Sequence, residues 1–265
     1  MASAPQPRIA TLPNLRDVGG HPTRDGGRVR AGLLFRSTDL SRLDDAGAAD
    51  LERLGVRTVF DLRSAAEREG RPDRLPEGAE HVIVDVLRDS AGLTPADMER
   101  VLATPEGAAQ ALGNGRAERF FVDAYREFVE LPSARAAYGR LFRELARPAR
   151  RPALVHCTTG KDRTGWATAT LLLLLGVPDE VVMEEYLLSG PVMAALFAPH
   201  LAAFEALGGD PALLRPLVEV RAGYLEAGLA AMRESYASVE RYVGDGLGVD
   251  GATREALRRA FVEPG

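Results

Sequence analysis

Two residues that could perform chemistry together lie near the middle of the chain: Cys157, which is its only cysteine, and Arg163. A thiolate can attack phosphorus, and a guanidinium group can bind two phosphate oxygens at once. The short apolar run 153–155 precedes them as a buried strand would, and the long apolar run 166–177 follows them as a helix would. A tight loop between a strand and a helix N-terminus turns backbone N–H groups toward an anion. The spacing therefore predicts a phosphate cradle with a cysteine nucleophile.

The other residues of this loop suit the same chemistry. The backbone N–H groups of 158–162 would face the equatorial phosphate oxygens, where transition-state charge gathers. Gly160 lies where the chain must turn tightly, at a positive φ that glycine tolerates best. Thr164 is placed to donate a hydrogen bond to the sulfur, and His156 is expected to order the loop rather than to act as an acid. The predicted phosphate-binding residues are Thr158, Thr159, Gly160, Lys161, Asp162 and Arg163.

Two ordinary interpretations of this stretch are weaker. A lone buried cysteine is usually inert, but a structural cysteine does not require Gly-Lys-Asp-Arg-Thr after it. The pair Gly160-Lys161 is not part of a nucleotide-binding Walker loop, because the first glycine of that motif is missing and Asp162 follows the lysine. Catalysis at Cys157 is therefore the favoured interpretation.

The pattern His156-Cys157-x-x-Gly160-x-x-Arg163 resembles the Cys-x5-Arg signature of the protein tyrosine phosphatase superfamily. With Lys161-Asp162 included, it is similar to the atypical bacterial tyrosine and phosphoinositide phosphatase branch. The resemblance implies a cysteinyl-phosphate intermediate and a tyrosine-phosphatase-like fold with a mobile helical cover. Weaker segments similar to the same branch lie at 14–20, 34–37, 60–64 with Glu67, 185–189 and 238–242.

The mechanism also needs a general acid, because expulsion of an alkoxide or phenolate requires a proton donor within hydrogen-bond reach. Many superfamily members use an Asp in a Trp-Pro-Asp loop, but the only tryptophan here is Trp166. The resemblance implies that Asp162 is the acid. The alternative is that Asp162 serves only as a charge partner of Lys161 and Arg163. The other candidates left open are Asp85, Asp89 and Asp123.

Several basic residues lie in the segments that carry the resemblance. Lys161 puts a cation inside the loop, which favours substrates with extra negative charge. Arg16, Arg36 and Arg63 form either a second phosphate-binding rim or salt bridges outside the site. Asp61 is expected to brace Arg63 or Arg36.

Composition indicates an ordinary compact enzyme. The chain has 265 residues, is 46% hydrophobic and 27% charged, and carries a net charge of −5, which predicts no nucleic-acid partner. The four histidines show no metal-ligand spacing, so neither a metal nor a cofactor is expected. No signal peptide is recognisable, and 166–177 is too short to span a bilayer. We therefore expect a cytoplasmic protein, with export by a leaderless route left open.

Strands that alternate with helices before a helical second half predict one α/β domain over 1–265, with a three-layer core around a mostly parallel sheet. The segment 89–117, with a short helix at 95–102, is expected to be a surface excursion, and about 190–234 a helical lid or ordinary core. Strands are expected at 30–35, 58–62, 81–86 and 153–155, and helices at 45–54, 118–146 with a break at Pro132, 166–177 and 178–188.

Together these observations predict a cysteine-dependent phosphomonoesterase. Its expected substrate is phosphotyrosine in a protein, with dual specificity or phosphoinositides as variants of the same activity. A small-molecule phosphatase acting on a nucleotide, sugar or inositol phosphate is the alternative. A phosphate-binding pseudophosphatase is disfavoured because both Cys157 and Arg163 are present.

Overall fold

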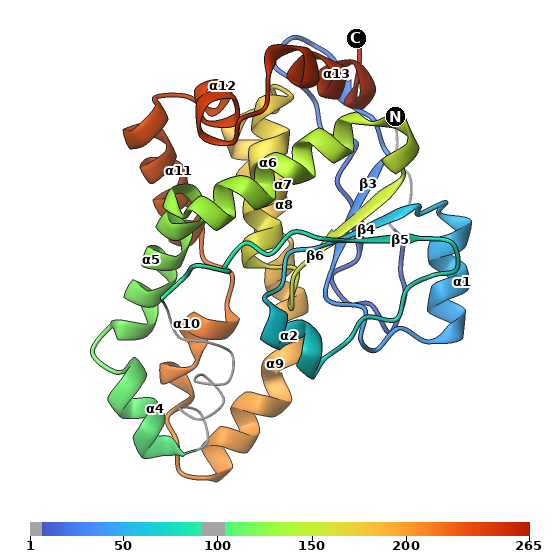
Figure 1. Ribbon diagram of the computed structural model, residues 1–265. Coiled ribbons are helices and arrows are strands. Elements are labelled where there is room, and N and C mark those ends of the chain that lie inside the picture. The colour runs from blue at the N-terminus through green and yellow to red at the C-terminus, as the bar shows by residue number, and fades with distance from the viewer. Residues whose placement is uncertain (1–6, 92–103) are drawn as a thin grey trace.

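A five-stranded sheet forms one side of the molecule (Figure 1). The structure is a computed structural model and describes residues 7–91 and 104–265. Only the first strand of the sheet, β1, is antiparallel to its neighbour, so the sheet is mostly parallel as predicted. The strand order is β1 (Arg16–Asp17), β3 (Leu34–Ser37), β6 (Ala153–His156), β4 (Thr58–Asp61) and β5 (Glu80–Ile83).

Helices cover both faces of this sheet. The strands β3, β4 and β6 are buried at every residue, which is typical of parallel strands that are covered on both sides. Because successive side chains point to opposite faces, Leu154 packs toward α1 (Asp45–Arg53), whereas Ala153 and Val155 pack into the main core. The predicted three-layer α/β arrangement is therefore confirmed.

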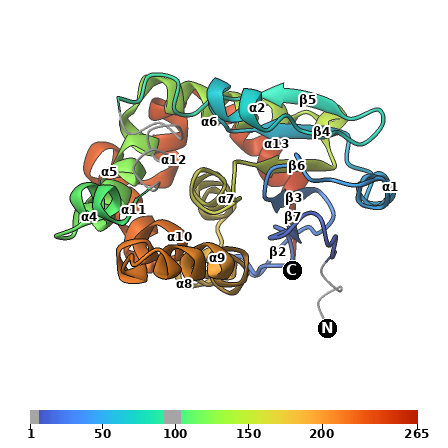
Figure 2. The ribbon, with the colours of Figure 1, turned by 90° about the horizontal axis from the view of Figure 1, so that it is seen from below.

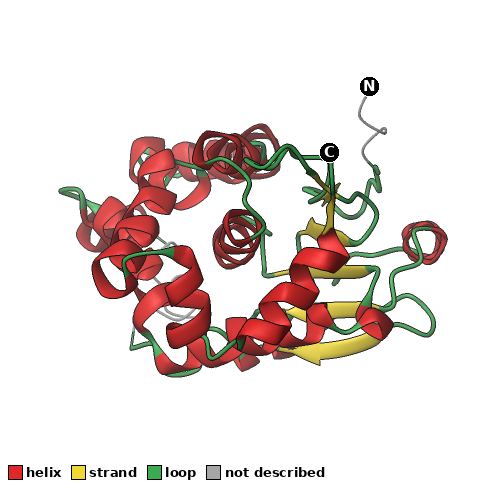
Figure 3. Cartoon of the chain, turned by 90° about the horizontal axis from the view of Figure 1, so that it is seen from above, coloured by secondary structure: helices red, strands yellow, loops and turns green. Residues whose placement is uncertain are grey.

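The remaining helices form the second half of the molecule around α7, which runs through its middle with the sheet on one side and α5 and α11 on the other (Figures 2 and 3). Residues 164–173 of α7 are all buried, as expected of a helix that is apolar on every side. In the part of the chain that the structure describes, the α-helices besides α1 are α2 (Ala65–Gly70), α4 (Pro105–Leu112), α5 (Arg116–Glu130), α6 (Pro132–Ala146), α7 (Asp162–Leu174), α8 (Asp179–Leu187), α9 (Ser189–Ala206), α10 (Arg215–Val218), α11 (Ala222–Tyr236), α12 (Val239–Arg241) and α13 (Gly251–Phe261).

Most predicted elements lie within a few residues of those observed. Pro132 separates α5 from α6 as expected, because proline is tolerated in the first turn of a helix but not in its interior. The two-residue strands β2 (Arg28–Val29) and β7 (Val262–Glu263), which pair with each other, are too short to leave a periodic pattern.

The predicted surface excursion is partly helical. Its expected helix at 95–102 lies outside the described residues, but α4 follows at Pro105–Leu112. Ala108 and Leu112 of α4 form a small apolar cluster with Phe204 of α9 and Leu214. This end of the segment is therefore packed against α9 and the start of α10.

The segment predicted as a lid divides into two parts. From Tyr224 onward, α11 packs in the main core beside α5, so that part is not a cover. By contrast, α9 buries only Ser189, Met193 and Phe204, and it projects away from the sheet in Figure 1. A lid over this segment stays a prediction, and α9 is the part of it that is least buried.

One described stretch, Asp179–Ala206, is long and apolar enough to cross a membrane by length and composition alone, because its most apolar window of 18 residues has a mean hydropathy of 1.6. It comprises α8 and α9 and is longer than the run 166–177 recognised in the sequence. Only 17% of that window is buried in the fold, and a single helix of this kind is weak evidence for a membrane span. We therefore assign no membrane span to it.

Candidate active site

The predicted loop lies between the carboxyl end of the central strand β6 and the N-terminus of α7. Gly160 adopts a φ of 65°, as the sequence predicted. A Cβ atom there would lie 2.0 Å from the carbonyl oxygen of Ser37, so this position excludes every other residue. Asn14 donates from Nδ2 to the carbonyl oxygens of Thr159 (3.2 Å) and Gly160 (3.1 Å). These contacts hold the loop from outside.

A buried ion-pair cluster supports the loop from the side of α8. Arg36 donates from Nη2 to the carbonyl oxygen of Gly160 (2.7 Å) and from Nη1 to Glu185 (2.7 Å). Arg16 donates from Nε to the other carboxylate oxygen of Glu185 (2.7 Å). Burial alone would raise the pKa of Glu185, but Arg36 and Arg16 lower it below its ordinary value. Burial, together with Arg36, lowers the pKa of Arg16 to about 10.

Of the two alternatives for Arg16, Arg36 and Arg63, the structure shows salt bridges and not a phosphate-binding rim. Arg36 and Arg63 are completely buried, and Arg16 is 7% exposed. Arg63 donates from Nε and Nη2 to the two oxygens of Asp61 (2.9 and 2.8 Å), so Asp61 braces Arg63 rather than Arg36. Each of these guanidinium groups stabilises the framework instead of facing a ligand.

Cys157 lies at the start of this loop, with an exposed fraction of 1%. Burial by itself raises the pKa of its thiol, but the charge of Arg163 and hydrogen bonds from the side chain and backbone N–H of Thr164 lower it below the ordinary value. Within the described ranges, the buried hydroxyl of Thr164 has no hydrogen-bond partner, so it is available to donate to this sulfur. The charge of Arg163 and this donor favour a thiolate at Cys157.

Arg163 forms a two-pronged ion pair with Glu67. Its Nη1 and Nη2 atoms each lie 2.7 Å from one carboxylate oxygen. Ser64 closes a capping box at the start of α2 by bonding with Glu67, and the hydroxyl of Thr158 donates to Glu67 as well. Burial by itself raises the pKa of Glu67, but the charge and hydrogen bonds of Arg163, together with hydrogen bonds from Thr158 and Ser64, lower it well below its ordinary value. Glu67 thus fixes the orientation of the guanidinium group.

A pocket of about 560 Å³ opens over this loop. One wall is apolar and comes mainly from α5, and another comes from the N-terminus of α2. The lining residues are Ser64, Ala65, Ala66, Glu67, Asp85, Leu87, Arg88, Ser90, Phe120, Phe121, Ala124, Phe128, Thr158, Thr159, Asp162, Arg163 and Leu217.

Comparisons with known proteins agree with this geometry. A model of the tyrosine phosphatase family matches residues 7–263. The chain belongs to the tyrosine phosphatase family.

Relatives of this phosphatase match along most of its length. It is similar to the triple specificity protein phosphatase PtpB of Mycobacterium tuberculosis, with 35% identity over 92% of this chain and 95% of the relative. A tyrosine-protein phosphatase of Nostoc commune is 31% identical over 81% of this chain and 69% of the relative. A protein of Cupriavidus necator is 35% identical over 91% of this chain and 83% of the relative.

The pocket reduces the candidates for the general acid of this phosphatase. Asp162 and Asp85 both line it, and Asp85 lies 3.7 Å from Arg68. Asp89 accepts hydrogen bonds from the backbone and side chain of Ser133, and Asp123 is exposed on α5 away from the lining. The choice is therefore between Asp162 and Asp85.

Two buried tyrosines orient Asp162. Tyr125 donates from its hydroxyl to Oδ1 of Asp162 (3.2 Å), and that hydroxyl also contacts the hydroxyl of Tyr186 (2.8 Å). The Nζ atom of Lys161 lies 3.7 Å from the other carboxylate oxygen. The sequence did not reveal Tyr125 or Tyr186, because an aromatic residue at helical spacing has the same signature as ordinary core.

Lys161 does not face the phosphate pocket as the sequence suggested. Its ammonium group donates to the carbonyl oxygens of Leu217 (2.8 Å) and Glu219 (3.1 Å), and it lies 4.7 Å from the centre of the Phe121 ring. Burial lowers the pKa of this ammonium group. Any contact of Lys161 with a phosphate would therefore come from its backbone N–H, while its side chain joins the loop to the end of α10.

Proposed function

We propose that this phosphatase hydrolyses phosphate monoesters through a cysteinyl-phosphate formed at Cys157. The thiolate attacks phosphorus and forms the S–P bond while the bond from phosphorus to the leaving oxygen breaks. Asp162 gives a proton to that oxygen. Water then attacks the same phosphorus and loses a proton to the Asp162 carboxylate, and the S–P bond breaks to release phosphate.

The other loop residues assist these two steps. Arg163, held by Glu67, can bind two equatorial oxygens of the phosphate, and the loop N–H groups can bind the third. Thr164 can stabilise the thiolate as it departs from phosphorus. Because Arg163 and the helix N-terminus supply the positive charge, we propose that the reaction is independent of metal. The observation that carries the proposal is the lowered pKa of a thiol placed next to this paired arginine.

The pocket supports an aryl phosphate as the preferred substrate. Phe120, Phe121 and Phe128 form an apolar wall beside Asp162 and Arg163, and such a wall can pack against the ring of phosphotyrosine. The name of the Mycobacterium tuberculosis relative describes triple specificity, so we extend the proposal to phosphoserine or phosphothreonine and to phosphoinositides. A nucleotide or sugar phosphatase has no comparable support.

The test of this proposal is Cys157→Ser with matched substrates. The variant should lose turnover of phosphotyrosine peptide and p-nitrophenyl phosphate while it still binds vanadate, because the cradle is unchanged. A chelator should leave the wild-type rate unaltered. Residual turnover within about tenfold of wild type, a barrier difference of only ~1.4 kcal/mol, would refute a covalent mechanism.

A cytoplasmic location also belongs to this proposal. A thiol with a lowered pKa is easily oxidised, and a reducing compartment keeps it active. Fractionation of cells that express the full chain from its own promoter would test it, and recovery of the protein outside the cytoplasm would contradict it.

A further inference from the structure

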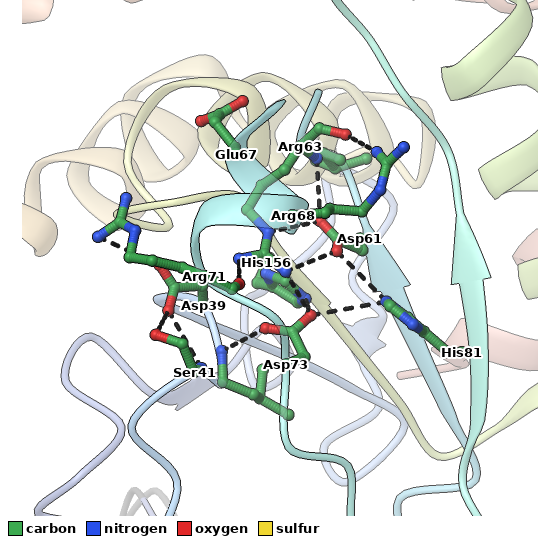
Figure 4. A network of polar contacts seen from close by, with 12 residues as sticks. Asp39, Ser41, Asp61, Arg63, Glu67, Arg68, Arg71, Asp73, His81 and His156 are labelled. Atoms are coloured by element: carbon green, nitrogen blue, oxygen red, sulfur yellow. Dashed lines mark hydrogen bonds and ion pairs between the residues drawn. The ribbon is translucent and has the colours of Figure 1, made fainter. Parts of the chain in front are cut away.

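Two groups of largely buried polar side chains lie beside the phosphate loop. The first is the network of Figure 4, in which one ligating atom from each of four residues lies within 4.8 Å of the others: Asp61, Asp73, His81 and His156. Arg63 already supplies a cation there, with Nη2 at 2.8 Å from Asp61 and 2.7 Å from Asp73. His156 also contacts the carbonyl oxygen of the next residue through Nδ1 (3.0 Å). None of these five described residues lines the pocket, so this network supports the framework of the loop.

The second group lies on the side of α5 and α8 and leads to Asp162, the proposed general acid. Tyr125 of α5 donates from its hydroxyl to Oδ1 of Asp162 (3.2 Å), and the hydroxyl of Tyr186 of α8 lies 2.8 Å from that of Tyr125. Both tyrosines are completely buried, and their rings pack edge to face with centroids 6.3 Å apart. Asp162 lines the pocket, so this chain of contacts runs from the core to the place where a substrate would bind.

The number of available hydrogens fixes the direction of these bonds. A phenol has one O–H, so a Tyr125 hydroxyl that donates to Asp162 accepts the hydrogen of Tyr186. The reverse order would leave the buried hydrogen of Tyr186 without an acceptor among the described residues, which is costly. Burial, followed by the neighbouring Tyr186 and Asp162, raises the pKa of Tyr125 well above its ordinary value, so its hydroxyl keeps its hydrogen at neutral pH. The two tyrosines therefore deliver one hydrogen bond to Oδ1 of Asp162.

This hydrogen bond determines which oxygen of Asp162 can carry a proton. Because Oδ1 accepts the hydrogen of Tyr125, a proton on the carboxyl group lies on Oδ2. In the part of the chain that the structure describes, Oδ2 accepts no hydrogen bond. The ammonium group of Lys161 is 3.7 Å from it, beyond hydrogen-bond distance, and donates to two backbone carbonyl oxygens instead. Oδ2 is thus the atom left to give a proton to a substrate.

We propose that Tyr125 is a positioning residue that presents Oδ2 of Asp162 to the leaving oxygen, with Tyr186 as its support. The inference rests on the proposed role of Asp162 as the general acid. The proton passes from Oδ2 to the leaving oxygen as the bond from that oxygen to phosphorus breaks. It leaves a carboxylate that Tyr125 already stabilises through Oδ1, and in the second step Oδ2 takes a proton from the attacking water.

Tyr125→Phe removes the hydroxyl and keeps the ring, which packs against Phe128 and Tyr224. The assay compares kcat/KM for a phosphotyrosine peptide, which has a poor leaving group, with kcat/KM for p-nitrophenyl phosphate, which has a good one. We expect the first to fall by about tenfold and the second by no more than about twofold, because only the poor leaving group needs a well-placed proton.

Tyr138→Phe is the matched control. It also removes a buried hydroxyl beside the loop, but this hydroxyl donates to the backbone carbonyl oxygen of Arg163 (3.2 Å) and has no hydrogen bond to Asp162. If it slows the enzyme at all, it should slow both substrates alike, so the ratio of the two kcat/KM values should equal that of wild type.

A second comparison removes the acid itself. In an Asp162→Asn background, Tyr125→Phe should not change the ratio further, because a residue that acts through Asp162 then has no acid to position. Tyr186→Phe takes away the hydrogen that Tyr125 accepts and should show the same selectivity to a smaller extent. This variant decides the question if Tyr125→Phe does not fold.

The outcomes separate this inference from the proposed function. Equal slowing of both substrates by folded Tyr125→Phe, or by Tyr186→Phe where only that variant folds, would overturn the inference while Asp162 remains the acid. A further change of the ratio by Tyr125→Phe in the Asp162→Asn background would also overturn it. Equal slowing by Asp162→Asn itself would instead contradict the acid step of the proposed function, and this inference would fall with it.

Discussion

Replacement of Glu67 by glutamine tests whether one buried carboxylate organises the active site. The side chains of Arg163 and Glu67 are only 11% and 5% exposed, and their two contacts are each 2.7 Å. At an effective dielectric constant of about 20, Coulomb's law gives roughly 6 kcal/mol of attraction at this separation. Desolvation offsets part of it, and loss of one partner from a buried pair typically costs about 3–5 kcal/mol. We expect the free energy of unfolding at pH 7 to fall by about 3 kcal/mol.

The pH dependence gives this prediction a second readout. Arg163 lowers the pKa of Glu67, so the pair contributes its full stability above the ordinary pKa of a glutamate and loses it as pH falls through the lowered value. The difference between wild type and Glu67→Gln in urea unfolding should thus be constant near neutral pH and shrink progressively as the pH falls below the ordinary pKa of a glutamate. Glu69→Gln, which changes an exposed residue of the same helix, is the control.

Activity should fall more than stability alone explains. In folded Glu67→Gln, Arg163 loses its two-pronged partner, and kcat for p-nitrophenyl phosphate should drop by about 100-fold because a misplaced clamp no longer fits the transition state. A variant with unfolding free energy within ~1 kcal/mol of wild type and with full activity would refute the reasoning.

Two further predictions concern the neighbours of Arg163 in the loop. Asp162→Asn should slow hydrolysis of phosphotyrosine far more than that of p-nitrophenyl phosphate, because a good leaving group needs no proton. Asp85→Asn is the comparison variant. Equal slowing of both substrates by Asp162→Asn would exclude Asp162 as the acid. Lys161→Met removes two hydrogen bonds to the end of α10 and should increase amide hydrogen exchange around 214–220. Unchanged exchange with a raised KM for highly charged substrates would show that Lys161 contacts the substrate instead.

The loop that carries Cys157 and Arg163 was predictable because it depends on consecutive residues. A strand, a tight turn and a helix N-terminus create the anion site locally. The stretch from Cys157 to Thr164 therefore indicates the chemistry without knowledge of the rest of the fold. The break at Pro132 and the apolar helix α7 were predictable for the same reason, since backbone geometry and burial on every side leave local patterns.

The residues that orient this cradle could be found only in the tertiary structure. Glu67 pairs with Arg163 although 96 positions separate them, and Glu185 pairs with Arg36, which lies 149 positions away and supports the loop. In the sequence, each is one acidic residue among 38. The parallel order β3–β6–β4–β5 brings the carboxyl ends of these strands together, and that packing decides which charges meet.

Thus the sequence by itself determined which atoms can react with phosphate, because reactivity depends on residue type and on spacing within one loop. Tertiary structure decided the direction of each side chain. Lys161 turned away from the pocket toward α10, and Arg36 and Arg63 turned inward as supports rather than outward as a rim. The physical reason is that a buried cation must lie beside acceptors, and only the folded chain determines where those acceptors are.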